Sequence, residues 1–394
     1  MKKSVVLFNM SNYWNWEAGV QNRNFHIFQA LLKDNDVSNI LLVDILPYTW
    51  KKAIKHYVNL SKIKKNKEVI WHNKFSVAYR VNEKVVVFSS VASYLSKKQW
   101  QNDFLDFWKT LQWSNVWEWN YNVFSYEYWQ GLIKADKKIF DAVDNWLLHS
   151  SYKKYQQKLE KNYQDLLSDS DIVFTVSKNL KKYFEKNFQS QDNIFYIPNA
   201  SPKSLVKDKI INKDLLLYKK IQNIKKSYKY ILGFIGVIQE NRIDFALLND
   251  LAKKNPEKAL VLCGPIWKGL QKKIKLLQKN KNVFCLGPVK RKDWYTVASQ
   301  FDIALSPHLT AGFMQYISPT KIYEYLAVGL PVISSKISGV DELSEFIYIA
   351  DTQEDFQGFI EKILSDKNAG QEKAWVAEDN LWSNRYEKIK KFCN

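Results

Sequence analysis

Arginine, cysteine and long apolar runs are scarce in this sequence of 394 residues. The three cysteines, Cys263, Cys285 and Cys393, show no metal-ligand spacing, so neither a zinc site nor a disulfide framework is expected. Cys263 and Cys285 end apolar runs, and we expect both to be buried strand residues. No apolar run reaches the roughly 18 residues of a membrane span, and the first residues are typical of a strand rather than a signal peptide. A cytoplasmic globular protein is therefore expected.

Acidic residues are also fewer than basic ones. The chain has 40 aspartates and glutamates and 59 lysines and arginines, so its formal net charge is +19. Only five of those basic residues are arginine, the side chain that reads bases and phosphates with two hydrogen bonds. Three explanations stay open: a generally charged surface, attraction to an anionic membrane, and binding of nucleic acid. Because no recognised nucleic-acid module appears, nucleic acid is the least favoured partner.

Apolar strands alternate with amphipathic helical segments in two successive sets, with a polar, lysine-rich linker that starts near residue 203. Two such sets predict an α/β protein with two Rossmann-like domains that face a central cleft. The second set begins with Gly233-x-x-Gly236, which is not the dinucleotide-binding fingerprint and therefore disfavours a redox enzyme.

The most informative stretch runs from residue 317 to residue 333 and predicts a short helix that leads into a buried strand. Ser318 is a good helix N-cap, Pro319 suits the first helical position, and Gly329 suits a left-handed helix end. Free N–H groups at the helix start, with Lys321 in the first turn, predict an anion site. Glu324, one turn later, is placed to accept hydrogen bonds from ribose hydroxyls. The alternative is an ordinary capped surface helix with a Lys–Glu pair.

Residues 319–333 read Pro-x-Lys-x-x-Glu-Tyr-Leu-Ala-x-Gly-x-Pro-Val-Ile, which resembles the nucleotide-sugar motif of retaining glycosyltransferases of family 4, with the GT-B fold. The likeness is closest to the bacterial surface-polysaccharide type. It implies an acceptor-binding domain at 1–202, a donor-binding domain at 203–372, and a terminal helix at 373–394 that packs back on the first domain. The commoner family pattern has a second glutamate where this chain has Tyr316, which leaves the usual contact to the donor sugar in question.

The resemblance also implies a donor site without metal or other cofactor. Arg242 and Lys321 would offset the charge of the leaving diphosphate, and both are candidate catalytic residues together with Asp144. The donor-binding candidates come from three loops and one short helix: Gly19, Gly236, Arg242, Gly287, Val289, Arg291, Ser318, Pro319, Thr320, Lys321 and Glu324.

Acceptor-binding candidates lie in the first domain. Arg23 follows the first glycine-containing loop, and Asp144 lies in a segment that resembles the "vDxW" stretch of polysaccharide-type transferases. Trp119 and Tyr121 follow a strand, where an aromatic face pairs well with a sugar ring. Residues 51–67 predict an amphipathic helix with a lysine-rich face, which rests either on an anionic bilayer or in solvent.

These observations predict a glycosyltransferase of the EC 2.4 class that moves a sugar from a nucleotide-sugar, UDP favoured over GDP, onto a glycan or a lipid-linked glycan. Retention of configuration and a role in bacterial cell-surface polysaccharide biosynthesis follow from the resemblance. We expect a cytoplasmic enzyme, peripheral on the inner face of the membrane. The alternatives are a two-domain sugar-nucleotide epimerase, a polyanion-binding protein without enzymatic activity, and a catalytically silent sugar-binding protein.

Overall fold

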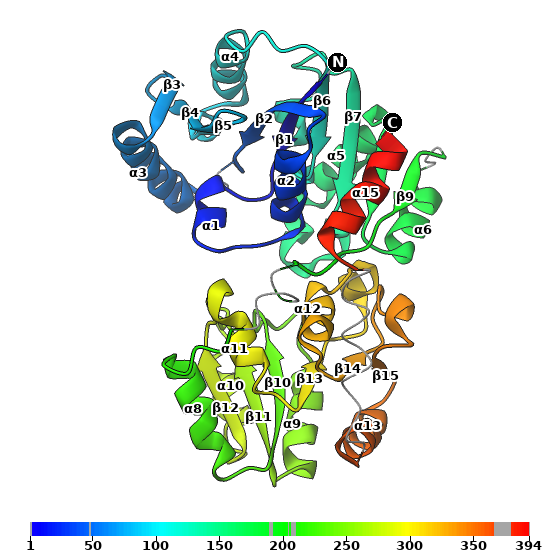
Figure 1. The fold of residues 1–394 in the computed structure, drawn as a ribbon. Helices are drawn as coiled ribbons and strands as arrows, with labels where there is room; N and C mark the ends of the chain where they lie inside the picture. The colour runs from blue at the N-terminus through cyan, green and yellow to red at the C-terminus, as the bar shows by residue number, and fades with distance from the viewer. Residues whose placement is uncertain are drawn as a thin grey trace.

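The computed structural model describes residues 2–46, 49–188, 192–203, 205, 210–365 and 380–393. The chain forms two α/β domains, one above the other in Figure 1, each built on its own sheet. The predicted fold class is therefore confirmed. The predicted boundary between residues 372 and 373 lies outside the described residues.

The N-terminal domain is organised around a sheet with the order β3-β4-β5-β2-β1-β6-β7-β8-β9. Its neighbouring strands pair in parallel, except that β4 runs antiparallel to β3 and β5. The strands are β1 (Lys3–Phe8), β2 (Val37–Val43), β3 (Glu68–His72), β4 (Ser76–Asn82), β5 (Val85–Ser90), β6 (Val116–Asn120), β7 (Lys137–Ala142), β8 (Ile172–Thr175) and β9 (Ile194–Tyr196). The helices are α1 (Tyr13–Glu17), α2 (Arg23–Lys33), α3 (Trp50–Asn66), α4 (Lys97–Trp108), α5 (Gln156–Asp169) and α6 (Lys178–Asn187).

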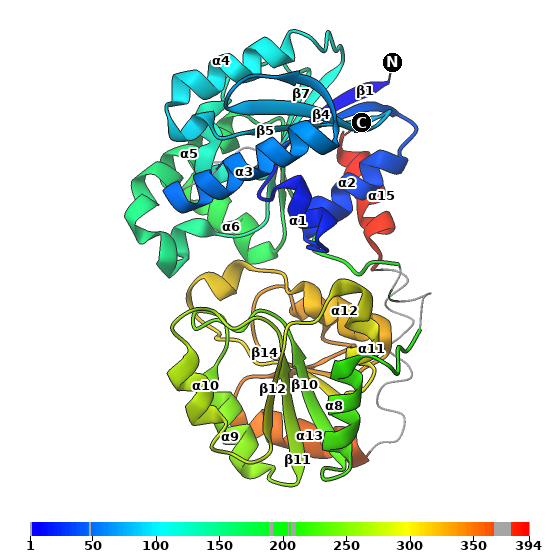
Figure 2. The ribbon, with the colours of Figure 1, turned by 90° about the vertical axis from the view of Figure 1, so that its left-hand side faces the viewer.

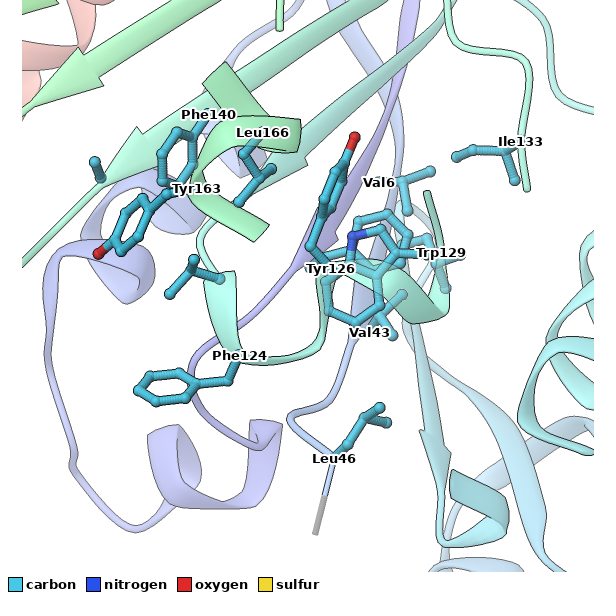
Figure 3. Packing of buried hydrophobic residues seen from close by; sticks show 14 of the residues in the cluster. Val6, Val43, Leu46, Phe124, Tyr126, Trp129, Ile133, Phe140, Tyr163 and Leu166 are labelled. Carbon is cyan, nitrogen blue, oxygen red and sulfur yellow. The ribbon is translucent and has the colours of Figure 1, made fainter. Parts of the chain in front are cut away.

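Apolar side chains cover both faces of this sheet. Strand β1 is buried along its whole length, as expected for a parallel strand with helices on both sides. One core lies beneath α4, α5 and α6 and is rich in aromatic rings; Figure 3 shows Trp129 close to Val6 and Val43 in it. The rings of Trp100 and Phe104 on α4 stack at 5.1 Å, and their spacing of four residues places both on the buried face of that helix.

The C-terminal domain is built on a parallel sheet with the order β12-β11-β10-β13-β14-β15. Its elements are α8 (Leu216–Lys225), β10 (Tyr230–Ile235), α9 (Phe245–Lys254), β11 (Lys258–Cys263), α10 (Gln271–Leu277), β12 (Val283–Gly287), α11 (Trp294–Ala298), β13 (Ile303–Ser306), α12 (Thr320–Val328), β14 (Val332–Ser335), β15 (Tyr348–Ala350) and α13 (Gln353–Ser365). Cys263 is buried at the end of β11 as predicted, whereas Cys285 is only partly buried because β12 is the edge strand.

The last helix, α15 (Trp382–Cys393), lies on the N-terminal domain beside α2, as Figure 1 shows in red. The hydroxyl of Tyr386 donates a 2.7 Å hydrogen bond to Asp34 Oδ2, and the Trp382 ring stacks on His26 at 4.9 Å. The predicted return of the chain end to the first domain is therefore confirmed. Within the described part of the chain, no helix combines the length and the apolar character that crossing a membrane requires.

Candidate functional site

A cleft lies between the two domains, next to the carboxyl ends of their parallel strands. Two adjoining cavities of about 490 and about 180 Å³ occupy it. Both are lined by Gln21 from the N-terminal domain and by Gly236, Val237 and Lys321 from the C-terminal domain. In open α/β sheets such crevices at strand ends are the usual ligand sites, so this space is the candidate functional site.

Most of the predicted site residues line one of the two cavities. The larger cavity has Arg23, Asp144, Gly236, Arg242, Ser318, Pro319, Thr320 and Lys321 in its wall, and the smaller one has Gly19, Gly236, Val289, Arg291 and Lys321. Glu324 lies directly behind the wall, where it holds Arg291 and Lys321. Gly287 ends β12 with a left-handed φ of 84° and lines neither cavity.

The start of α12 is presented to the larger cavity. The helix begins at Thr320 and ends at Gly329, whose φ of 86° is left-handed as predicted. The prediction that Ser318 caps the helix is wrong: Pro319 occupies the cap position, and Ser318 contacts Asn199 instead. Asn199 Nδ2 donates a 2.7 Å hydrogen bond to the Ser318 carbonyl oxygen, which ties the two domains together. Without a side-chain cap, the first N–H groups of α12 stay available to an anion in the cavity.

Glu324 is a buried carboxylate between two cations. Arg291 donates a 2.6 Å hydrogen bond to Oε1, and Lys321 Nζ donates a 2.8 Å hydrogen bond to Oε2. Burial by itself would raise the pKa of Glu324, but the charges and hydrogen bonds of Lys321 and Arg291 lower this pKa below its ordinary value. The group is therefore ionised at neutral pH, and it aligns both cations along the wall that the two cavities share.

Arg242 places a positive charge in the wall of the larger cavity. It lies just before α9, and no ion pair to it occurs within the described residues. Its Nε is buried without a hydrogen-bond partner there, and its guanidinium carbon lies 4.9 Å from the centre of the Phe313 ring. A buried donor with no acceptor costs free energy, so this side chain is prepared for an anionic ligand.

Asp144 faces Arg242 across the larger cavity, two residues after the end of β7. Its backbone carbonyl accepts a 2.8 Å hydrogen bond from Tyr163, whereas its carboxylate has no hydrogen-bond partner among the residues described. Burial raises the pKa of Asp144 to about 6, against the opposing effect of Arg242. Nearby, burial and the charge of Arg242 lower the pKa of His308 to about 4, so this ring is neutral. The cavity thus holds one carboxylate that titrates near neutral pH.

Arg23 lines the larger cavity but is mostly engaged by the protein. Its Nε contacts both carboxylate oxygens of Asp141, at 2.9 and 3.0 Å, and NH1 donates to the carbonyl of Ile197 at 3.0 Å. With the side chain 3% exposed, only NH2 is left without a partner among the described residues. Arg23 therefore ties α2 to β7 and to the chain segment after β9.

The prediction that Trp119 and Tyr121 stack on a sugar is wrong. Both side chains are 1% exposed and belong to the core under α2 and α15, where neither ring offers a free face. Large aromatic side chains pack on the core side of β6. The sequence alone does not show which side of a strand faces the core and which faces the cleft. Trp146 lines the larger cavity instead, close to Asp144 in sequence.

Sequence reasoning did not single out Gly264 and Gln21, which also line the cavities. Gly264 has φ +153°, and a Cβ there would lie 1.7 Å from the carbonyl oxygen of Gly236. Only glycine fits this close approach of two strand ends. Its place directly after the apolar run of β11 was the available signal.

Comparison with known proteins agrees with this architecture. Residues 229–366 match the family described as "Glycosyl transferases group 1". A match of 25% identity over 169 residues relates the chain to the "Putative teichuronic acid biosynthesis glycosyltransferase TuaH" of Bacillus subtilis, covering 41% of this chain and 42% of that protein. The "Chitobiosyldiphosphodolichol beta-mannosyltransferase" of Debaryomyces hansenii is 24% identical over 207 residues, or 47% of this chain and 43% of that protein. The chain thus matches less than half the length of these curated relatives.

Solved structures resemble the whole chain. The Anabaena Alr3699/HepE protein in complex with UDP and glucose has a TM-score of 0.67 at 13% identity, over 99% of each chain. The trehalose-6-phosphate synthase OtsA has a TM-score of 0.71 at 10% identity, over 100% of this chain and 99% of that one. The fold is therefore the GT-B fold. The C-terminal domain matches the group 1 glycosyltransferases, and the curated relatives that resemble part of the chain are named as glycosyltransferases.

Proposed function

We propose that this protein transfers a sugar from a nucleotide-sugar, UDP-linked in preference to GDP-linked, to a glycan or lipid-linked glycan acceptor. The observation that carries this proposal is the unpaired guanidinium of Arg242, which lines the same cavity as the start of α12. The Anabaena structure named for UDP and glucose, and the relative named for teichuronic acid biosynthesis, support a UDP-sugar donor and a role in bacterial cell-surface polysaccharide synthesis.

In this proposal the diphosphate lies at the N–H groups of Thr320 and Lys321, opposite Arg242. Negative charge develops on the bridging oxygen as the sugar bond breaks, and fixed positive groups stabilise it. Glu324 accepts hydrogen bonds from the ribose, beside the smaller cavity lined by Gly19 and Arg291. The positive charge comes from the protein, so we propose transfer without a metal ion.

Asp144 is proposed to accept a hydrogen bond from the attacking hydroxyl of the acceptor, since its carboxylate is unpartnered and lies beside the donor-binding groups. We propose retention of configuration by attack on the face from which the diphosphate leaves. This route needs no carboxylate nucleophile: the bond from the sugar carbon to the phosphate oxygen breaks as the bond to the acceptor oxygen forms, the hydroxyl proton passes to Asp144, and Arg242 holds the departing diphosphate.

Calorimetric titration with UDP, GDP, ADP and CMP tests the donor assignment. We expect selective binding of UDP by the wild type and at least about tenfold weaker binding by Lys321→Ala, because a charge-assisted contact to phosphate is lost. Lys272→Ala, which removes an exposed lysine of α10 outside both cavities, is the matched control and retains binding. Folded protein that binds none of the four nucleotides would contradict the proposal.

Helix α3 supports a peripheral location on the inner face of the membrane. The predicted amphipathic helix is present, and its exposed surface carries Trp50, Ile54, Tyr57 and Val58 among lysines. Apolar and basic side chains together bind anionic bilayers. We expect co-sedimentation with vesicles containing phosphatidylglycerol but not with neutral phosphatidylcholine vesicles, and a double Trp50→Ser, Ile54→Ser variant to lose it. Equal recovery with both vesicle types would count against this location.

A further inference from the structure

A third cavity, of about 280 Å³, lies within the N-terminal domain beside the cleft. Its wall combines the loop after β1, the segment after β2 and helix α3, and Figures 1 and 2 show α1 and α3 next to each other there. Met10 lines this cavity and the larger cleft cavity alike, so the two spaces are neighbours. A chain-like ligand bound in the cleft on its acceptor side therefore has a place to continue.

Helix α3 presents three distinct faces, and one of them is assigned to this cavity. Ala53, Leu60 and Ile63 are buried in the domain, and the exposed apolar residues described above point to solvent. The cavity face carries Lys52, Lys55, His56 and Asn59, at the spacing of one helix stripe. This polar stripe thus forms one wall of the hollow, with Lys52 and Lys55 exposed and His56 buried.

The lining of this cavity has the chemistry of an acidic sugar site. It contains the indole of Trp14, the amides of Asn12, Asn15 and Asn59, and two lysines, and no carboxylate occurs among the described residues that line it. Lys55 makes no ion pair within the described ranges, and Asn12 Oδ1 is buried there without a hydrogen-bond partner. The charge of Lys55 and the unsatisfied amide oxygen of Asn12 favour an anionic, hydroxyl-rich ligand.

A buried hydrogen-bond chain holds the ring of His56 in position. His56 Nε2 lies 2.9 Å from Ser89 Oγ, which lies 2.6 Å from Asp44 Oδ2, and Asp44 Oδ1 accepts a 2.7 Å bond from the N–H of Tyr13. Burial lowers the pKa of His56 to about 4, so the ring is neutral. Trp14 packs edge-on against it at 4.6 Å between ring centres. The aromatic side of the cavity is therefore fixed before any ligand arrives.

We propose that this cavity binds an acidic sugar residue of the acceptor, one that bears a carboxylate or a phosphate. Trp14 packs on the apolar face of the sugar ring, the asparagines bind its hydroxyls, and Lys55 with Lys52 contacts the anionic group. The inference rests on the proposed transferase function, because it places the acceptor chain between this cavity and Asp144. It selects a class of acceptor that the cleft residues by themselves do not specify.

The test uses three probes on the full chain: a hyaluronan tetrasaccharide, which carries carboxylates, glucose 6-phosphate, and the uncharged cellotetraose. We expect calorimetric binding of at least one charged probe, at least about tenfold tighter than cellotetraose. Lys55→Gln and Trp14→Ala should each weaken that binding about tenfold. Lys65→Gln, which removes the same charge from an exposed position of α3 on the side of Ile54 and Val58 and outside this cavity, should leave it unchanged. Which charged probe binds distinguishes a carboxylate from a phosphate.

Equal affinity of Lys55→Gln and wild type for the charged probes, or no preference over cellotetraose, would overturn the inference. UDP titration of the same samples separates this failure from failure of the proposed function. Intact UDP binding with no glycan preference rejects only the acidic-sugar site. Loss of UDP binding in the wild type rejects the donor assignment, whereas a folded Trp14→Ala variant that keeps UDP binding shows that its glycan defect is local.

Discussion

Arg242→Ala is expected to lower kcat about 10²- to 10³-fold with UDP-sugar as donor, the effect of removing a preorganised charge that meets the leaving group. The side chain has no ion pair to lose within the described residues, and its Nε is already without a partner. The substitution therefore removes little native stabilisation, and the free energy of unfolding should change by only about 1 kcal/mol. Steady-state kinetics and thermal unfolding of the same preparation measure both quantities.

Two further variants test whether the loss of kcat comes from the guanidinium of Arg242 and not from the loss of any arginine. Arg242→Lys keeps the charge but not the planar fork, and we expect it to recover only part of kcat. Arg80→Ala removes an arginine from an exposed pair with Glu68 at the edge of the N-terminal sheet, and its activity should equal that of the wild type. Wild-type kcat in Arg242→Ala would refute the assignment of this residue to the leaving group.

Asp144→Asn is expected to lower kcat about 10²-fold, because an amide cannot take up the proton of the attacking acceptor hydroxyl. The pKa of Asp144, raised to about 6, also predicts a pH profile. The ionised form is the hydrogen-bond acceptor, so wild-type activity should rise with pH, with a midpoint near pH 6, and level off above it. The residual activity of Asp144→Asn should lack this rise.

The raised pKa of Asp144 also makes the free energy of unfolding depend on pH. A carboxylate whose pKa is raised on folding binds its proton more tightly in the folded state, so its ionisation costs stability as pH rises above the unfolded value near 4. Asp144→Asn should remove that cost and leave the protein at least as stable at pH 8. Asp106→Asn, at an exposed position of α4, serves as the control for both measurements. An unchanged pH profile in Asp144→Asn would exclude Asp144 as the titrating group.

Local sequence predicted the elements that depend on neighbours along the chain. The helix that begins at Thr320, its end at Gly329 and the following strand all follow from proline, glycine and apolar spacing. The burial of Trp100 and Phe104 follows from their helical spacing. These features depend on φ preferences and on the period of the apolar pattern, which sequence records directly.

Prediction was weaker where the outcome depended on which side chain reaches a partner from the other domain. Ser318 is a residue type that caps helices, yet its hydroxyl and carbonyl oxygens accept hydrogen bonds from Asn199 of the N-terminal domain. Trp119 has the chemistry of a sugar platform, yet it fills the core under α2 and α15, whereas Trp14 and Trp146 line cavities. No local pattern distinguishes these aromatic residues, because exposure depends on what packs above each strand end.

The sequence by itself determined the class of fold and the short helix that begins at Thr320, since both follow from periodicity and turn residues. Only the tertiary structure decided that Arg242, Asp144 and the start of α12 share one cavity and that Arg291 and Lys321 share Glu324. The physical reason is that charge pairing and burial act through space. Each depends on groups that the chain brings together from distant strand ends, which no stretch of sequence contains.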